Sequence, residues 1–150
     1  MTACQRLLCL GLASYCAAAV AACGDDNTPT SPSATTPTET AAEPSVTEEF
    51  VGTMSVNGAR FYAFEVGTYG TVNVTLDRVG GGGVPTTVWV GLGVGVPEGV
   101  DCSTTTSLST QSGTGPHVST TLAAGTYCAR IYDIGNLAAP APFAVTIAHP

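Results

Sequence analysis

Cysteine is the residue type whose positions in this 150-residue chain say most about its chemistry, and there are six of them. Three fall in the first 16 residues, in or just before an apolar run at residues 7–20. Cys23 follows that run after two alanines. Cys102 and Cys128 lie far downstream, where two thiols can oxidise to a disulfide.

Residues 1–22 have the composition of an export signal, with one positive charge at Arg6, the apolar run, and small residues before Cys23. The run is shorter than the about 20 apolar residues that a membrane-spanning helix needs, so we expect cleavage. The stretch Val20-Ala21-Ala22-Cys23 resembles the lipobox of bacterial lipoproteins. The resemblance implies that Cys23 is lipidated and begins the mature protein. The alternative is an ordinary secretory signal, which would leave Cys23 as a reactive free thiol in an oxidising compartment.

The resemblance also implies a location. A lipidated Cys23 would hold the protein on a membrane of the bacterial cell envelope, outside the cytoplasm, through its acyl chains. In lipoproteins of double-membrane bacteria, an aspartate directly after the cysteine resembles an inner-membrane retention signal, and this chain has Gly24 there. The outer membrane is therefore favoured over the inner membrane.

The same assignment accounts for the remaining cysteines. Cys4, Cys9 and Cys16 leave with the signal, and Cys23 carries the lipid. Only Cys102 and Cys128 are then left in the mature domain, and exported proteins meet oxidising conditions. We therefore predict a disulfide between these two residues.

Residues 23–49 are predicted to form a disordered tether that begins at the lipidated cysteine. Thr, Pro, Ser, Ala and acidic residues dominate them, with hardly any large apolar side chain to bury. The composition is also typical of an O-glycosylated stalk, and both interpretations remain open. The chain has a formal net charge of −7, and its four basic residues are all arginines. Nucleic-acid binding needs a basic surface, so no nucleic-acid partner is expected.

Residues 50–150 are predicted to form a single all-β domain, because apolar residues alternate with polar ones at a period of two. Asn57-Gly58 predicts a hairpin between residues 50–56 and 60–66. The most regular run, residues 88–96, places Val88 and Val96 at the ends of an aliphatic core face, and residues 97–115 read as a polar segment. The expected fold is an antiparallel, jelly-roll-like β-sandwich of about seven to eight strands.

The order of these elements is similar to that of the bacterial pre-peptidase C-terminal domain. The resemblance lies in Phe50-Val51-Gly52, Arg60-Phe61-Tyr62-Ala63-Phe64, residues 70–76, residues 122–127 with Arg130-Ile131-Tyr132, and residues 142–147. It implies a jelly-roll-like accessory or binding module, which such proteins usually carry beside an enzyme.

Catalytic signatures are scarce in this sequence. Without lysine there is no Walker A site and no Schiff-base chemistry. His117 and His149 lie in no zinc-protease motif and no Gly-x-Ser-x-Gly elbow occurs, although a triad of His117 with a distant serine stays open. We therefore expect a non-enzyme with no cofactor and no metal. Calcium remains an alternative, because five oxygen-bearing side chains fall at predicted strand ends: Asp77, Glu98, Asp101, Asp133 and Asn136.

Side-chain parity suggests where a ligand would bind. In residues 88–96 the aliphatic face must be the core, which turns Trp89 outward beside Gly91, Gly93 and Gly95. Phe61 and Tyr132 have the same outward parity in their strands. Flat aromatic surfaces suit sugar rings or peptide segments. The alternative is that these three aromatics lie on different sheets or are covered, and serve packing alone.

The sequence therefore predicts a membrane-anchored envelope lipoprotein that displays a non-catalytic β-sandwich with a structural or ligand-binding role. Its partners would be the membrane, through the lipid anchor, and an envelope polymer or protein. The alternative function is an accessory subunit that assists or targets a secreted hydrolase by binding its polymer or peptide substrate. A small hydrolase that uses His117 is a third hypothesis.

Overall fold

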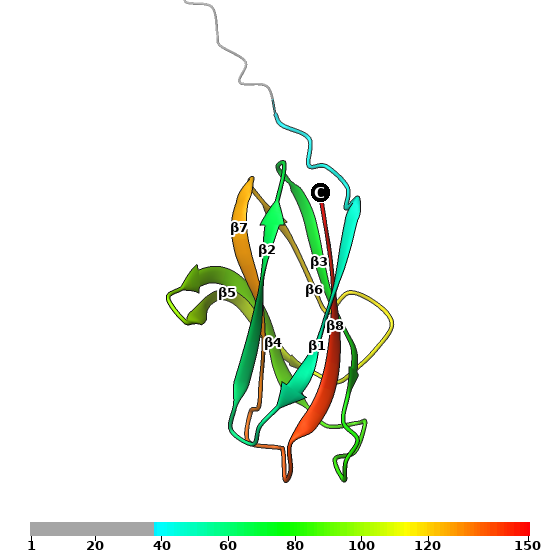
Figure 1. Cartoon of the computed structure of the whole chain (residues 1–150). Helices are drawn as coiled ribbons and strands as arrows, with labels where there is room; N and C mark the ends of the chain where they lie inside the picture. Colours follow the sequence, from blue (N-terminus) through cyan, green and yellow to red (C-terminus); the bar gives the residue numbers. More distant parts are fainter. Residues whose placement is uncertain (1–37) are drawn as a thin grey trace, which may run out of the picture. The chain divides into compact units, whose positions relative to one another are not determined.

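A computed structural model of the chain describes residues 38–150, and eight β-strands occupy most of them (Figure 1). The predicted signal, the lipobox and most of the predicted tether lie outside the described residues. The strands are β1 (Val46–Met54), β2 (Ala59–Val66), β3 (Gly70–Val79), β4 (Val90–Glu98), β5 (Asp101–Thr110), β6 (Val118–Leu122), β7 (Gly125–Tyr132) and β8 (Ala141–His149).

The strands form two four-stranded antiparallel sheets, in the orders β1-β8-β3-β6 and β2-β7-β4-β5. Strand pairing follows a nested pattern in which β4 pairs with β5, β3 with β6, β2 with β7 and β1 with β8. This is the topology of a jelly roll, in which one long folded-back double strand is wound into two facing sheets. The predicted all-β, antiparallel sandwich is confirmed, with eight strands.

The core lies between the two sheets and consists mainly of aliphatic side chains. Alternate residues of each strand point inward, because successive side chains of a strand face opposite sides of its sheet. One sheet contributes residues such as Leu76 and Phe143, and the other contributes Leu92, Ile131 and Phe64, all of them buried. The period-two pattern of the sequence is therefore the pattern of this shared core.

Asn57 and Gly58 do form a tight turn, but the turn joins two sheets and not two paired strands. Asn57 has a φ of 55°, and the Gly58 N–H donates a 2.9 Å hydrogen bond to the Ser55 carbonyl. β1 lies in one sheet and β2 in the other. The hairpin that the sequence predicts is therefore wrong. The tight turn is real, and it changes sheets because each strand finds its hydrogen-bonding partner late in the chain, β8 for β1 and β7 for β2.

The folded domain begins before residue 50, the start that the sequence predicts. β1 begins at Val46, and its inward face carries Glu48 and then Phe50. Upstream of β1, Ala42 forms a bridge with Gly70, and the Thr71 N–H donates to the Ala42 carbonyl at 2.8 Å. A side chain at Gly70 would begin 2.4 Å from that carbonyl oxygen, so glycine is needed for this close approach.

The register places two sets of loops at opposite ends of the sandwich. We call the end where β1 starts the entry end, and the end where β1 stops the distal end. Met54 pairs with Ala141, Ala59 with Tyr132, and Tyr132 also with Gly91, so the connections at 55–58, 80–89 and 133–140 all lie at the distal end (Figure 1). A nine-residue strand of about 3.3 Å per residue separates the two ends by about 30 Å.

Candidate functional site

The three aromatic residues predicted to face outward lie on the same face of the same sheet or at its border. Phe61 in β2 pairs with Arg130 in β7, which in turn pairs with Gly93 in β4. Tyr132 pairs with Gly91 two residues nearer the distal end. Paired residues of neighbouring strands share a face, so these side chains all lie on the side of the sheet opposite the core. Trp89 stands just before β4, exposed between buried Val88 and Val90.

Ile134, two residues after Tyr132, is a further exposed apolar residue at the distal end. Trp89 is 50% exposed and Ile134 is 40% exposed. The Asn136 side-chain amide donates a 3.2 Å hydrogen bond to the Trp89 carbonyl, which ties the loop after β7 to the start of β4. We call the five residues Phe61, Arg130, Tyr132, Ile134 and Trp89 the aromatic strip. It runs along the outer face of the sheet β2-β7-β4-β5 to the distal end.

Tyr132, and not Trp89, covers the glycine at the start of β4. A side chain at Gly91 would begin 2.1 Å from Cζ of Tyr132, with both Cε atoms almost as close. The tyrosine ring therefore rests on bare backbone. The parity argument correctly turned Trp89 outward, but the ring on that glycine comes from the neighbouring strand. Tyr132 is half-buried as a result, with one face of its ring on the sheet.

Arg130 lies over the Tyr132 ring and was not predicted as a site residue. Its Cζ lies 5.5 Å from the centroid of the Tyr132 ring, within the range of a cation–π contact. Its Nε is 3.6 Å from Oδ1 of Asp101, an ion-pair distance that is too long for a hydrogen bond. This Nε is buried without any hydrogen-bond partner among the described residues. The signal in the sequence was the outward parity that Arg130 shares with Tyr132.

The hairpin of β4 and β5 folds over the same face and borders the aromatic strip. The register shifts between Val94 and Gly95, and a side chain at Gly95 would meet the Ser103 backbone. Cys102 in β5 is joined to Cys128 in β7 by a disulfide, with Cα atoms 6.0 Å apart, which fits the pairing that the sequence predicts. β7 and the disulfide thus hold the hairpin close to Arg130.

This hairpin corrects two further expectations. Val96 is 48% exposed and does not belong to the core, because the bulge after Val94 breaks the alternation on which that expectation rested. The segment predicted to be merely polar contains β5, a ten-residue edge strand rich in serine and threonine. Threonine is β-branched and favours strands, and an edge strand needs little apolar surface.

Asp133 organises the loops at the distal end. Its carboxylate accepts four backbone N–H groups, from Asn57 and Gly135 at 2.8 Å and from Asn136 and Leu137 at 2.8 and 3.2 Å. Partial burial pushes the pKa of Asp133 upward, but these four donors outweigh it and leave the pKa below its ordinary value. The loop that carries Ile134 is therefore fixed to the turn between β1 and β2.

The two histidines have separate places and bonds. The Leu76 N–H donates to Nδ1 of His117 at 3.1 Å, and the backbone around His117 continues the edge of β3 next to β6. His117 thus completes the hydrogen bonding of β3 where its register shifts. Among the described residues, neither histidine is hydrogen-bonded to a serine hydroxyl.

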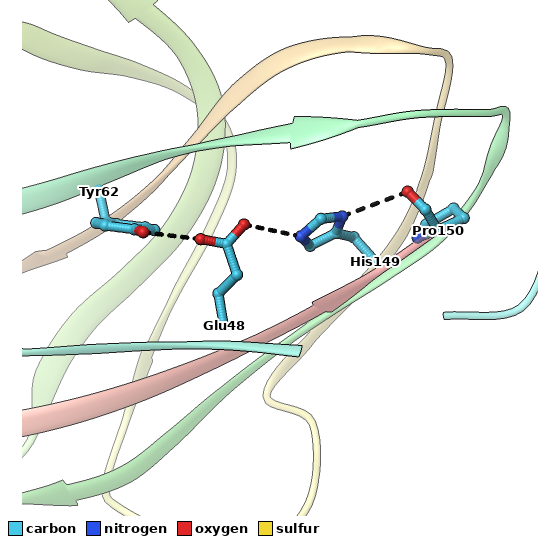
Figure 2. A network of polar contacts seen from close by, with 4 residues as sticks. All are labelled: Glu48, Tyr62, His149 and Pro150. Carbon is cyan, nitrogen blue, oxygen red and sulfur yellow. Dashed lines mark hydrogen bonds and ion pairs between the residues drawn. The ribbon is translucent and has the colours of Figure 1, made fainter. Parts of the chain in front are cut away.

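His149 belongs to a polar network at the entry end that the sequence did not reveal (Figure 2). Its Nε2 is 3.0 Å from Oε1 of Glu48, and the Tyr62 hydroxyl donates to the other carboxylate oxygen at 2.7 Å. The hydrogen bond to Glu48 is the main cause that raises the pKa of Tyr62, followed by the repulsion between the two charges and by burial. The His149 side chain is buried. Because the three residues come from β8, β1 and β2, the network links these strands where the edges of the two sheets meet.

Four of the five oxygen-bearing side chains considered for calcium, all but Glu98, serve other contacts. Asp77 accepts the Thr146 hydroxyl at 2.7 Å, Asp101 accepts the Cys102 N–H at 2.8 Å, and Asp133 and Asn136 bind the backbone as described. Within residues 38–150, no three His, Cys, Asp or Glu side chains gather as a metal site would require. No pocket is found over the same residues, so the aromatic strip is an open surface.

Cys23, the predicted lipidation site, lies outside the described residues. In the part of the chain that the structure describes, no helix is long and apolar enough to cross a membrane. Neither a scan against models of protein families nor a search of curated proteins finds a match for this chain.

Proposed function

We propose that this chain is a lipid-anchored protein of the bacterial envelope that binds an extracytoplasmic polymer through the aromatic strip and performs no catalysis. Cys23 would carry the lipid, with the outer membrane favoured, and the tether would hold the sandwich away from the bilayer. The binding residues are Trp89, Phe61 and Tyr132, joined by Ile134 and Arg130.

The observation that carries this proposal is the exposure of Trp89 at the distal end of a sheet whose outer face carries Tyr132 and Phe61. Indole and tyrosine rings are among the largest apolar groups that a protein can bury, and soluble domains rarely leave them grouped on a surface without a partner. Hydrogen bonds around Asp133 and the stack on Gly91 hold these groups in fixed positions, which lowers the entropic cost of binding.

The orientation of the domain supports the same proposal. The chain enters the sandwich at the start of β1, and Trp89 and Ile134 lie at the opposite end, about 30 Å away along the strands. A domain tethered through residues 24–41 would thus be held by one end, with the strip reaching the other.

Fluorescence titration of the full chain tests the proposal, because Trp89 is its only tryptophan and reports on this surface alone. We expect a change in emission on addition of an envelope polysaccharide or a cell-wall fragment. Trp89→Ala should weaken binding measured by co-sedimentation with the polymer while the melting temperature stays within a few degrees.

Tyr69→Ala is the matched control, since Tyr69 lies in the turn between β2 and β3 at the entry end. Equal binding by the wild-type chain and Trp89→Ala, or a large loss of stability in Trp89→Ala, would assign Trp89 to packing and remove the proposed site.

A further inference from the structure

We propose that the aromatic strip selects a polysaccharide that bears carboxylate groups, and that Arg130 binds the carboxylate. This inference rests on the proposed function and adds the class of ligand to it. It starts from Arg130, for whose guanidinium the described residues supply no hydrogen bond, although one of its nitrogens is buried. The buried Nε faces Asp101 at 3.6 Å and is out of reach of a ligand, so a ligand would engage the two terminal nitrogens.

Arg130 is presented for ligand contact. Its guanidinium lies over the Tyr132 ring, with Cζ 5.5 Å from the ring centroid, and the side chain is 29% exposed. Asp101 lies on the Nε side at 3.6 Å, so the two terminal nitrogens have no acceptor among the described residues. A planar guanidinium with free terminal N–H groups matches a carboxylate through two parallel hydrogen bonds.

Asp101 balances the charge of Arg130, so a carboxylate would be recognised through paired hydrogen bonds to the guanidinium and not through a general positive field. Arg130 is the only basic residue of the aromatic strip, and the strip contains no acid. On the same face Asp101 is engaged near Nε, and Glu65 lies four residues beyond Phe61 toward the entry end. At physiological salt the repulsion from acids elsewhere on the domain is screened over about 8 Å, whereas contact with Arg130 is not.

The strip suits sugar rings better than a peptide strand. Peptides commonly bind sheets by pairing with free backbone groups at an edge. Arg130 and Tyr132 lie on β7, a central strand whose backbone groups are already paired on both sides. Phe61 lies on the edge strand β2, and Trp89 and Ile134 lie in loops. What this surface offers is ring faces, together with the hydroxyls of Ser107 and Ser109, which pair with Gly93 and Gly91 beside the strip. Ring faces next to hydroxyls match a sugar polymer, and the absence of a pocket over residues 38–150 matches an extended chain.

The test compares two polymers that differ only in the carboxylate, polygalacturonate and its methyl ester, with alginate as a second carboxylated probe. Binding of the full chain is measured by affinity electrophoresis. We expect the wild-type chain to bind polygalacturonate or alginate at least about tenfold more tightly than the neutral ester. Arg130→Gln should bring binding of the acid form down to that of the ester and leave binding of the ester unchanged.

Two further variants keep the test decisive. Arg78→Gln removes an exposed arginine from β3 in the other sheet and should leave the preference intact. Arg130→Lys keeps the charge but cannot form the bidentate pair of hydrogen bonds, so it should retain only part of the preference. This variant also provides a second test in case Arg130→Gln misfolds.

The outcomes separate this inference from the proposed function. Equal binding of acid and ester that is lost in Trp89→Ala overturns the role of Arg130 and leaves the polymer-binding strip standing. Failure of the wild-type chain to bind either carboxylated polymer overturns the carboxylate inference, and failure to bind any polymer, neutral ones included, overturns both. An undiminished preference in Arg130→Gln also refutes the inference.

Discussion

Gly91→Ala is the substitution whose effect follows most directly from the structure. A methyl group at this position would begin 2.1 Å from Cζ of Tyr132, far inside van der Waals contact, so the ring must leave the sheet. Overpacking of this kind typically costs about 1–3 kcal/mol. The cost should lie at the low end, because the ring is at a surface and can rotate away, although it then loses its contact with Arg130.

Thermal and urea unfolding of the variant measure this cost, and a loss of 1 kcal/mol in a domain of this size lowers the melting temperature by about 4–8 °C. Gly115→Ala is the matched control, since a side chain there meets no atom within 4 Å, and its stability should change by no more than about 0.5 kcal/mol.

A double-mutant cycle with Tyr132→Ala identifies the cause. Removing the ring removes the clash, so Gly91→Ala should cost little in the Tyr132→Ala background, with a coupling energy of about 1 kcal/mol or more. Strictly additive effects of the two substitutions would refute the stacking of Tyr132 on Gly91. Gly95→Ala offers a contrast, because its methyl group would meet the Ser103 backbone and no side-chain truncation can relieve it.

Three other predictions concern different parts of the chain. Replacing Cys102 and Cys128 with serine should cost about 3.5 kcal/mol for a loop of 26 residues, and thiol titration of the unfolded, unreduced protein should find neither thiol free. The lowered pKa of Asp133 means that its stabilising effect is present above the ordinary pKa of 3.8 and is lost as pH falls through the lower folded value. Asp133→Asn should therefore lose roughly 1 kcal/mol at pH 7, because an amide N–H would face the Asn57 N–H, and should weaken the pH dependence of unfolding below pH 4. Cys23→Ala should abolish lipid labelling and release the protein or leave its precursor uncleaved, and labelled lipid that persists in this variant would contradict the anchor.

Much of the fold could be predicted because its core strands obey a simple rule. In β3 and β8, buried apolar residues alternate with more exposed ones, and the alternation in the sequence is the alternation of the sheet. β5 and the start of β1 escaped prediction because they are edge strands. β5 carries serine and threonine on both faces, and β1 carries Glu48 on its inward face at the entry end, where Tyr62 and His149 satisfy the carboxylate.

The sequence predicted on which side of the strands the side chains of the candidate site lie, but not which residues lie next to them. The outward direction of Trp89, Phe61 and Tyr132 follows from the strand period alone. Pairing between distant strands decides that Tyr132 lies beside Gly91 and Phe61 beside Arg130, and nothing local in the sequence encodes that register. Arg130 is identified as a site residue only by the position of β7 between β2 and β4.

The three glycines of β4 show how the structure changes the meaning of a sequence signal. Alternate glycines beside an outward tryptophan suggested that the indole stands over bare backbone. Gly91 instead admits the ring of Tyr132, and Gly93 and Gly95 admit the folded-over β5, whose Ser107 and Ser103 occupy the space that side chains would take. The glycines therefore bring the β5 hairpin and Tyr132 tight against the sheet, and the disulfide and Asp101 then set one border of the surface on which Arg130 lies. A ligand would contact the layer built on these glycines, and so glycine substitutions should impair binding through Tyr132 and Arg130 and not through lost backbone contacts.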